Sequence, residues 1–121
     1  MYGWRARIGA IVPSTNTAVE SEFNTMKPEG VSIHASRMVS LENSVEILFN
    51  LAKDTERASY ELGTTMCNTI VYACTSGSFV GGPKWEQELV ERMEKASGTK
   101  AITTSGAVVR ALKQLGVKKS V

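Results

Sequence analysis

The sequence predicts an α/β fold in which a parallel sheet of four to five strands has helices on both faces, making three layers. Two observations predict it. Short apolar runs rich in β-branched residues alternate with longer segments whose apolar residues recur at helical spacing, which is the pattern of strands joined by crossover helices. The 121 residues, of which 42% are hydrophobic, suffice for one core and not for two. We therefore expect residues 1–121 to form a single lobe.

The first three elements are marked by their boundaries. Residues 7–12 form a short apolar run that Pro13 stops, as expected of a buried strand. Thr17, followed three residues later by Glu20, makes a capping box, which predicts the start of a helix. Residues 31–37 then alternate between apolar and polar side chains, which predicts a strand near an edge of the sheet.

The middle of the chain predicts a long helix followed by a central strand. Asn43 with Glu46 is a second capping signal, and the helix that it opens ends near Gly63. Residues 69–73 are β-branched and aromatic and are apolar on both faces, so we place them inside the sheet. A loop over residues 76–82 is expected to follow.

The last elements repeat the alternation. Pro83 stands where a first helical residue would, and its helix reaches about Ala96. Residues 100–102 predict a short strand, residues 107–115 a helix, and residues 117–121 the start of a fifth strand. Ligands of such open sheets bind beyond the carboxyl ends of the strands, so functional residues are expected there.

Charge and cysteine usage narrow the class of partner. Fourteen Lys and Arg against twelve Asp and Glu leave a net charge of +2, too small and too evenly spread to predict a nucleic-acid or membrane surface. No apolar run approaches the roughly 20 residues of a membrane span, and no export signal is visible. Cys67 and Cys74 flank a predicted strand and would lie roughly 20 Å apart, too far for a disulfide. Free thiols fit a reducing compartment, so we expect a cytoplasmic protein.

Hydroxyl and amide side chains follow the first strand, at Ser14, Thr15, Asn16 and Thr17. One interpretation is an anion or carboxylate site in which hydroxyls, amides and backbone N–H groups donate to the ligand. The other is an ordinary capped turn, since these residue types are common in such turns. Both interpretations stay open on the residues alone.

The end of the third strand carries a stronger signal, a thiol at the start of a glycine-containing turn. Cys74 is followed by Thr75, Ser76 and Gly77, which add donors and permit close approach of the backbone to a ligand. This setting favours the reactive thiolate form. The alternative is a buried structural cysteine, but its place at the strand end favours a functional one. Cys67, which precedes the strand, is interpreted as packing.

Several other site classes are disfavoured. Pro83 separates the glycines of residues 77–82 from Lys84, unlike a phosphate-binding loop, and no dinucleotide-binding glycine pattern follows the first strand. A cysteine phosphatase would want an arginine soon after Cys74, and a phosphate-accepting receiver domain would want an acidic residue at the end of the first strand. The lone His34 lies away from the expected site, so neither a Cys-His pair nor a metal site is predicted. No cofactor is implied.

Together, these motifs resemble the aspartate/glutamate racemase superfamily, and within it the maleate cis-trans isomerase and arylmalonate decarboxylase branch. The resemblance runs from about Trp4 to Val121. The residues that carry it are Pro13-Ser14-Thr15-Asn16-Thr17 with Glu20, Glu22 and Phe23, then Pro28-Glu29-Gly30-Val31, Arg37-Met38 and Ala73-Cys74-Thr75-Ser76-Gly77-Ser78.

The resemblance implies a flavodoxin-like lobe, the N-terminal half of a two-lobe enzyme that holds a small carboxylate or dicarboxylate in the cleft between its lobes without a cofactor. Such enzymes take one cysteine from each lobe. The second half has no counterpart here, so we expect a separated lobe that is inactive alone and that pairs with a complementary C-terminal lobe or with another copy. The site residues implied are catalytic Cys74, with Thr15, Asn16, Thr75, Ser76 and the backbone of Gly77 binding the substrate.

Three functions remain in view. Arylmalonate decarboxylases of this branch have glycine where Cys74 stands, so the resemblance favours isomerase or racemase chemistry. In an isomerase, the thiolate would attack the double bond of a dicarboxylate such as maleate; in a racemase, two thiols would exchange a proton on opposite sides of a carbon. The third is a flavodoxin-like binding or assembly module without catalysis.

Overall fold

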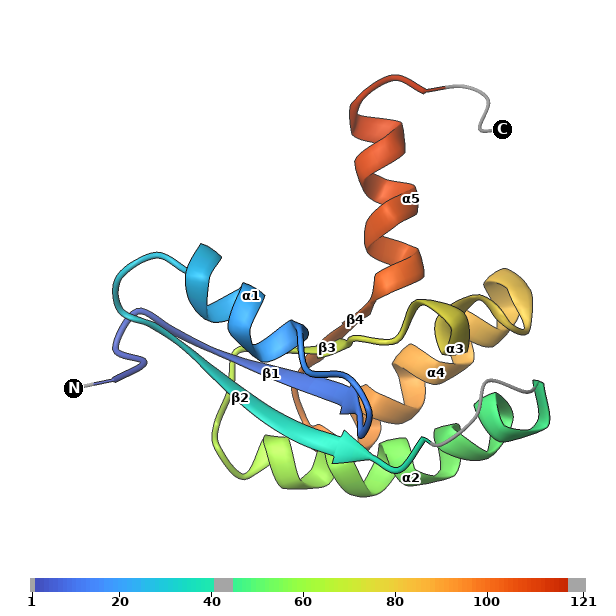
Figure 1. Ribbon diagram of the computed structural model, residues 1–121, viewed down its shortest axis with the longest axis horizontal. Coiled ribbons are helices and arrows are strands. Elements are labelled where there is room, and N and C mark those ends of the chain that lie inside the picture. The colour runs from blue at the N-terminus through green and yellow to red at the C-terminus, as the bar shows by residue number, and fades with distance from the viewer. Residues whose placement is uncertain (1, 41–44, 118–121) are drawn as a thin grey trace.

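The computed structural model describes residues 2–40 and 45–117, without the side chains of residues 45–52 (Figure 1). Strands and helices alternate as predicted. The elements are β1 (Ala6–Pro13), α1 (Val19–Met26), β2 (Val31–Met38), α2 (Val45–Gly63), β3 (Thr69–Tyr72), α3 (Thr75–Phe79), α4 (Gly82–Ser97), β4 (Lys100–Thr103) and α5 (Thr104–Gln114).

The four described strands form one parallel sheet in the order β2-β1-β3-β4. This is the strand order of a flavodoxin-like lobe, and it confirms the predicted edge position of β2 and the internal position of β3. Tyr72 pairs with Ile11 of β1 and with Thr103 of β4, so β3 and β4 end level with each other and β1 runs two residues further. Residues 118–121, most of the predicted fifth strand, lie outside the described residues.

The main hydrophobic core lies between the sheet and the helix pair α2 and α4 (Figure 1). Ile11, Ile70 and Tyr72 point from the strands into this layer and are at most 1% exposed. Leu89 and Met93 of α4 meet them and are fully buried. Because α4 buries apolar side chains on one face, its apolar residues recur in the sequence with the 3.6-residue period of a helix.

The opposite face of the sheet is only partly covered. α1 lies over it, whereas α5 projects away from the sheet (Figure 1). Val71 and Ile102, which are on this face of β3 and β4, are therefore half-buried. Val108 of α5 is 42% exposed, and Leu115, which directly follows α5, is 78% exposed. Helices stand on both faces, as predicted, but within the described residues only one face is fully packed.

Two local predictions were wrong. α1 begins at Val19, and the Thr17–Glu20 capping box does not form, because the amide oxygen of Asn16 accepts the first helical N–H groups instead. The loop predicted over residues 76–82 contains the short helix α3, which is closed by a bond from the Ser78 N–H to the Cys74 carbonyl at 3.1 Å. Asn43 of the second capping pair lies outside the described residues.

Candidate active site

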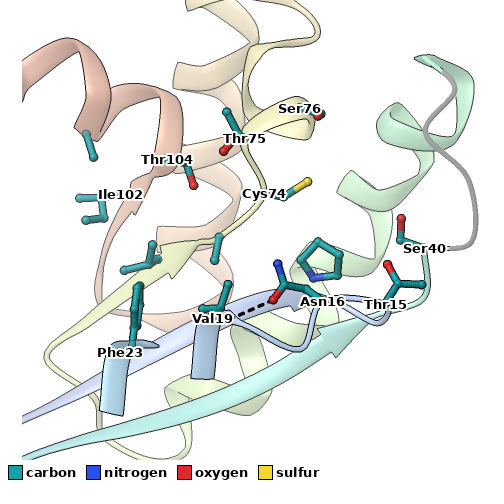
Figure 2. Close-up of a pocket in the computed structure, with 14 residues that line it drawn as sticks. Thr15, Asn16, Val19, Phe23, Ser40, Cys74, Thr75, Ser76, Ile102 and Thr104 are labelled. Atoms are coloured by element: carbon teal, nitrogen blue, oxygen red, sulfur yellow. Dashed lines mark hydrogen bonds between the residues drawn. The ribbon is translucent and has the colours of Figure 1, made fainter. Parts of the chain in front are cut away.

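A pocket of ≈ 740 Å³ opens at the carboxyl ends of β1 and β3. Sheet order reverses between these two strands, and open parallel sheets bind ligands at such reversal points. The residues that line it are Pro13, Thr15, Asn16, Val19, Phe23, Ser40, Val71, Ala73, Cys74, Thr75, Ser76, Ile102, Thr104 and Ala107 (Figure 2). Five of the six sequence-predicted site residues are in this set, and Gly77 is not.

Asn16 is oriented by the first turn of α1. Its amide oxygen accepts hydrogen bonds from the Ala18 N–H at 2.8 Å and the Val19 N–H at 3.0 Å. Since the oxygen is occupied, the amide nitrogen is left to donate, and Figure 2 shows it on the side of the Cys74 loop. The structure thus shows the capped turn, in which the amide oxygen of Asn16 is the acceptor, and it places the rest of the side chain on the pocket wall.

Cys74 joins β3 to α3 and stands on the pocket wall. It is half-buried and in the reduced form, and its side chain makes no capping bond to α3. One side of the residue packs against the core, while Figure 2 shows its sulfur between Ser76 and the Asn16 loop. The thiol is thus fixed by its neighbours but accessible from the pocket. Cys67, by contrast, is 6% exposed and donates to the Leu62 carbonyl at 3.3 Å, which confirms its packing role.

Gly77 lies behind the thiol rather than on the pocket wall. A Cβ atom at this position would stand 2.8 Å from the Tyr72 hydroxyl oxygen and 3.2 Å from the Cys74 sulfur. Tyr72 is buried and hydrogen-bonds Thr55; burial raises the pKa of the Tyr72 hydroxyl, and the charge of Cys74 raises it further. The Tyr72 hydroxyl therefore stays protonated, and the absence of a side chain at Gly77 leaves room for both the hydroxyl and the thiol.

A buried polar network ties the Cys74 side of the pocket to α5. The Ser105 N–H donates to the Ser78 hydroxyl at 3.2 Å, and the Ser105 hydroxyl donates to the Ser78 carbonyl at 3.2 Å. The Thr103 hydroxyl donates to Glu86 at 2.7 Å and accepts from the Gly106 N–H at 3.0 Å. The Ser105 bonds fix the N-terminal end of α5 against α3, which carries Thr75 and Ser76, and the Thr103 bond to Glu86 ties the same end to α4.

Sequence reasoning missed Ser40 and Thr104 as lining residues. Both lie within two residues of a strand end, so the same rule that singled out Cys74 would have found them. Ser40 comes two residues after β2, and its N–H donates to the Ser14 hydroxyl at 2.9 Å. The Thr104 hydroxyl donates to the Tyr72 carbonyl at 3.0 Å. The apolar part of the wall comes from residues such as Phe23 and Ile102.

The chemistry of the pocket is that of neutral donors around a thiol. Its described lining contains hydroxyl, amide, thiol and apolar side chains and no charged residue. An anion in it would be held by dipoles, which stabilise a charge that develops during a reaction. Across residues 2–40 and 45–117, no three His, Cys, Asp or Glu side chains gather as a metal site would require. Over the same described residues, no helix has the length and apolarity to span a membrane.

Comparison with known proteins shows the family of the chain. The family model described as arylmalonate decarboxylase matches residues 8–121. A maleate isomerase of Geobacillus stearothermophilus is 29% identical over 93% of the chain and 50% of its own length. Two solved structures each match 92% of the chain and 49% of their own length. One is a variant of a maleate isomerase of Pseudomonas putida with maleate, at 28% identity and a TM-score of 0.82. The other is a variant of a maleate cis-trans isomerase of Nocardia farcinica with a covalently bound succinylcysteine intermediate, at 27% identity and a TM-score of 0.80.

The chain spans about half the length of the curated relatives it matches. The similarity extends through both loops of the pocket, since the matched residues include Thr15, Asn16 and Cys74. Because the family model matches nearly the whole chain and the fold is shared with about half of a solved relative, the protein belongs to the arylmalonate decarboxylase family.

Proposed function

We propose that this chain is the N-terminal lobe of a cofactor-independent isomerase of the maleate isomerase type, with Cys74 as its nucleophile. The observation that carries the proposal is that Cys74 shares one pocket with the donors Thr15, Asn16, Thr75 and Ser76. A pocket with neutral donors fits a substrate that carries its own negative charges. A dicarboxylate with a double bond offers both a group for these donors and an electrophilic carbon for a thiolate.

The reaction proceeds by addition, rotation and elimination. An electron pair of the Cys74 thiolate forms a C–S bond to one alkene carbon of maleate, and the π pair moves into the carboxylate attached to the other carbon, giving an enediolate. Asn16 and Thr15 donate to the oxygens on which this charge develops. Rotation about the resulting single bond is followed by collapse of the enediolate, which re-forms the double bond and expels the thiolate. Cys74 enters and leaves as thiolate, so no redox partner is needed.

Two comparisons support the isomerase over the decarboxylase. The curated relatives are maleate isomerases, and the Nocardia farcinica structure contains a succinylcysteine intermediate, a covalent adduct of the kind this mechanism forms. The resemblance drawn from the sequence also places glycine at the Cys74 position in arylmalonate decarboxylases. A cysteine there favours addition to a double bond.

A complementary lobe completes the proposed enzyme. Val71 and Ile102 in the pocket wall are half-buried, and Val108 of α5 and Leu115 just after it are exposed, so the open face of the sheet and the region of α5 both leave apolar side chains uncovered. Burying such side chains favours association. The relatives are about twice as long as this chain, so we assign the covering role to a second lobe like theirs, which would also supply the second cysteine.

The test is turnover of maleate in a defined assembly. The chain is mixed with the second half of a maleate isomerase of the family, assembly is verified by sedimentation, and fumarate is followed by proton NMR. We expect fumarate with the wild-type chain, loss with Cys74→Ser and persistence with Cys67→Ala. A stable assembly that makes no fumarate, or that makes it equally with Cys74→Ser, contradicts the proposal. Exchange of an α-proton of aspartate or glutamate with heavy water would instead identify a racemase.

A further inference from the structure

The loop that carries Thr15 and Asn16 is held from outside the pocket. Within the loop, the Asn16 N–H donates to the Pro13 carbonyl at 2.9 Å, and the Ser14 N–H donates to the Met38 carbonyl at 2.6 Å. The second bond attaches the start of the loop to β2 and the first closes the turn, but neither uses the carbonyl groups of Ser14 and Asn16. The conformation that presents the Asn16 amide to the pocket therefore depends on what satisfies those carbonyls.

Arg37 of β2 supplies the donors. Its Nη1 donates to the carbonyl oxygens of Asn16 at 2.9 Å, Ser14 at 3.3 Å and Pro13 at 3.4 Å. Its Nη2 pairs with the carboxylate of Glu20 in the first turn of α1. One guanidinium thus connects the loop on both sides of Thr15 with the helix that follows it, although Arg37 does not line the pocket.

Arg37 is itself held in place by α2. The Nη2 of Arg57 donates to the backbone carbonyl of Arg37 at 2.7 Å. Arg57 also binds Asp54 and Glu61 on its own helix, and its hydrogen bond lowers the pKa of Asp54, so that carboxyl stays ionised. The bond from Arg57 of α2 therefore holds the backbone at the end of β2, from which the Arg37 side chain extends.

We propose that Arg37 is a positioning residue that keeps the Thr15–Asn16 loop in the conformation that receives a substrate carboxylate. This inference rests on the proposed function for its ligand. The ion pair with Glu20 is 42% exposed on both sides and is of little energetic value alone. The geometry matters more, because a planar guanidinium can hold several fixed acceptors at once, whereas a lysine ammonium is a point charge that cannot reproduce this arrangement.

The experiment uses two independent readouts on the 121-residue chain. The first is the protection of Cys74 from iodoacetamide by increasing maleate, with mass spectrometry of peptides to assign the alkylated thiol. The second is hydrogen exchange of the backbone amides of Asn16, Ala18 and Val19. The variants are Arg37→Gln and Arg37→Lys. The matched control is Arg110→Gln, an exposed arginine of α5 outside the pocket lining.

We expect Arg37→Gln to weaken maleate protection about tenfold, the effect of losing one good hydrogen bond to a charged group. The rate of Cys74 alkylation without maleate should stay within about twofold, because Cys74 is held by α3 and the core. A merely structural role would change both rates together. Exchange of the three loop amides should accelerate, Arg37→Lys should restore only part of the protection, and Arg110→Gln should change neither readout.

Unchanged protection together with unchanged amide exchange in Arg37→Gln would overturn the inference, as would full recovery in Arg37→Lys. Absence of maleate protection in the wild-type chain would count against the proposed function instead. In that case the amide exchange still decides the role of Arg37, since faster exchange at Asn16, Ala18 and Val19 supports it and unchanged exchange refutes it.

Discussion

Replacing Gly77 with alanine tests the packing behind the candidate nucleophile. Gly77 lies inside α3, where alanine is ordinarily preferred over glycine by about 0.5–1 kcal/mol. The structure predicts the opposite sign here. An added Cβ would stand 2.8 Å from the Tyr72 hydroxyl oxygen and 3.2 Å from the Cys74 sulfur, and Tyr72 is 1% exposed and cannot swing away. Overpacking of this kind costs about 1–3 kcal/mol, so with both ranges taken at their middle the net loss of stability is about 1 kcal/mol.

Urea unfolding measures the effect, and two further variants locate it. Ser76→Ala changes an exposed position of the same helix and should leave the free energy of unfolding within about 0.5 kcal/mol of wild type. Tyr72→Phe removes the hydroxyl that the new methyl group would meet. In the double variant Gly77→Ala with Tyr72→Phe, part of the loss should disappear, giving a coupling of about 1 kcal/mol. A Gly77→Ala variant as stable as the wild type or more so would refute this description of the site.

Four other outcomes follow from the structure. Asn16→Asp keeps an oxygen for the N–H groups of Ala18 and Val19 but removes the amide donor and adds a negative charge. Titration with maleate should therefore show binding weaker by about tenfold or more. The midpoint of urea unfolding should change little, because the capping oxygen remains. Gly98 ends α4 at φ 73°, and Gly98→Ala should lower stability in urea by about 1 kcal/mol. Iodoacetamide should modify half-buried Cys74 in the folded chain and Cys67 only after unfolding, as peptide mapping would reveal; equal rates would contradict the assigned burial. Burial raises the pKa of Tyr72, so above about pH 10 the folded chain retains a proton that the unfolded chain releases. The free energy of unfolding should therefore fall as pH rises beyond that value, and it should fall less in Tyr72→Phe. Thermal unfolding at a series of pH values measures both.

The order of the elements was predictable because each one buries a single face or is buried on both. Residues 69–73 carry no charged side chain and are β-branched, aromatic or small on both faces, and this placed β3 inside the sheet as observed. The same rule located the pocket, since parallel strands end at one edge and bring Asn16 and Cys74 together although they are far apart in sequence. Five of the six predicted site residues line that pocket for this reason.

The local errors come from contacts between distant segments. α3 was missed because Gly77 and Ser78 are poor helix formers, yet Trp85 donates to the Gly77 carbonyl at 2.9 Å and Ser78 bonds to Ser105, so tertiary contacts outweigh propensity. The capping box at Thr17 was a sound local prediction, but the turn after β1 places Asn16 nearer to the first helical amides. The bonds from Arg37 to the same loop span more than 20 residues and leave no local signal.

The central claim is that the loops after β1 and β3 form one carboxylate site beside Cys74. Titration of the isotope-labelled chain with maleate, followed by backbone amide NMR, tests it most directly. The amides of Thr15, Asn16, Cys74 and Thr75 should shift along one saturation curve, while the amide of Gly98, at the opposite end of the sheet, stays in place. Shifts confined to one loop, separate affinities for the two loops, or no shift at either would contradict the claim.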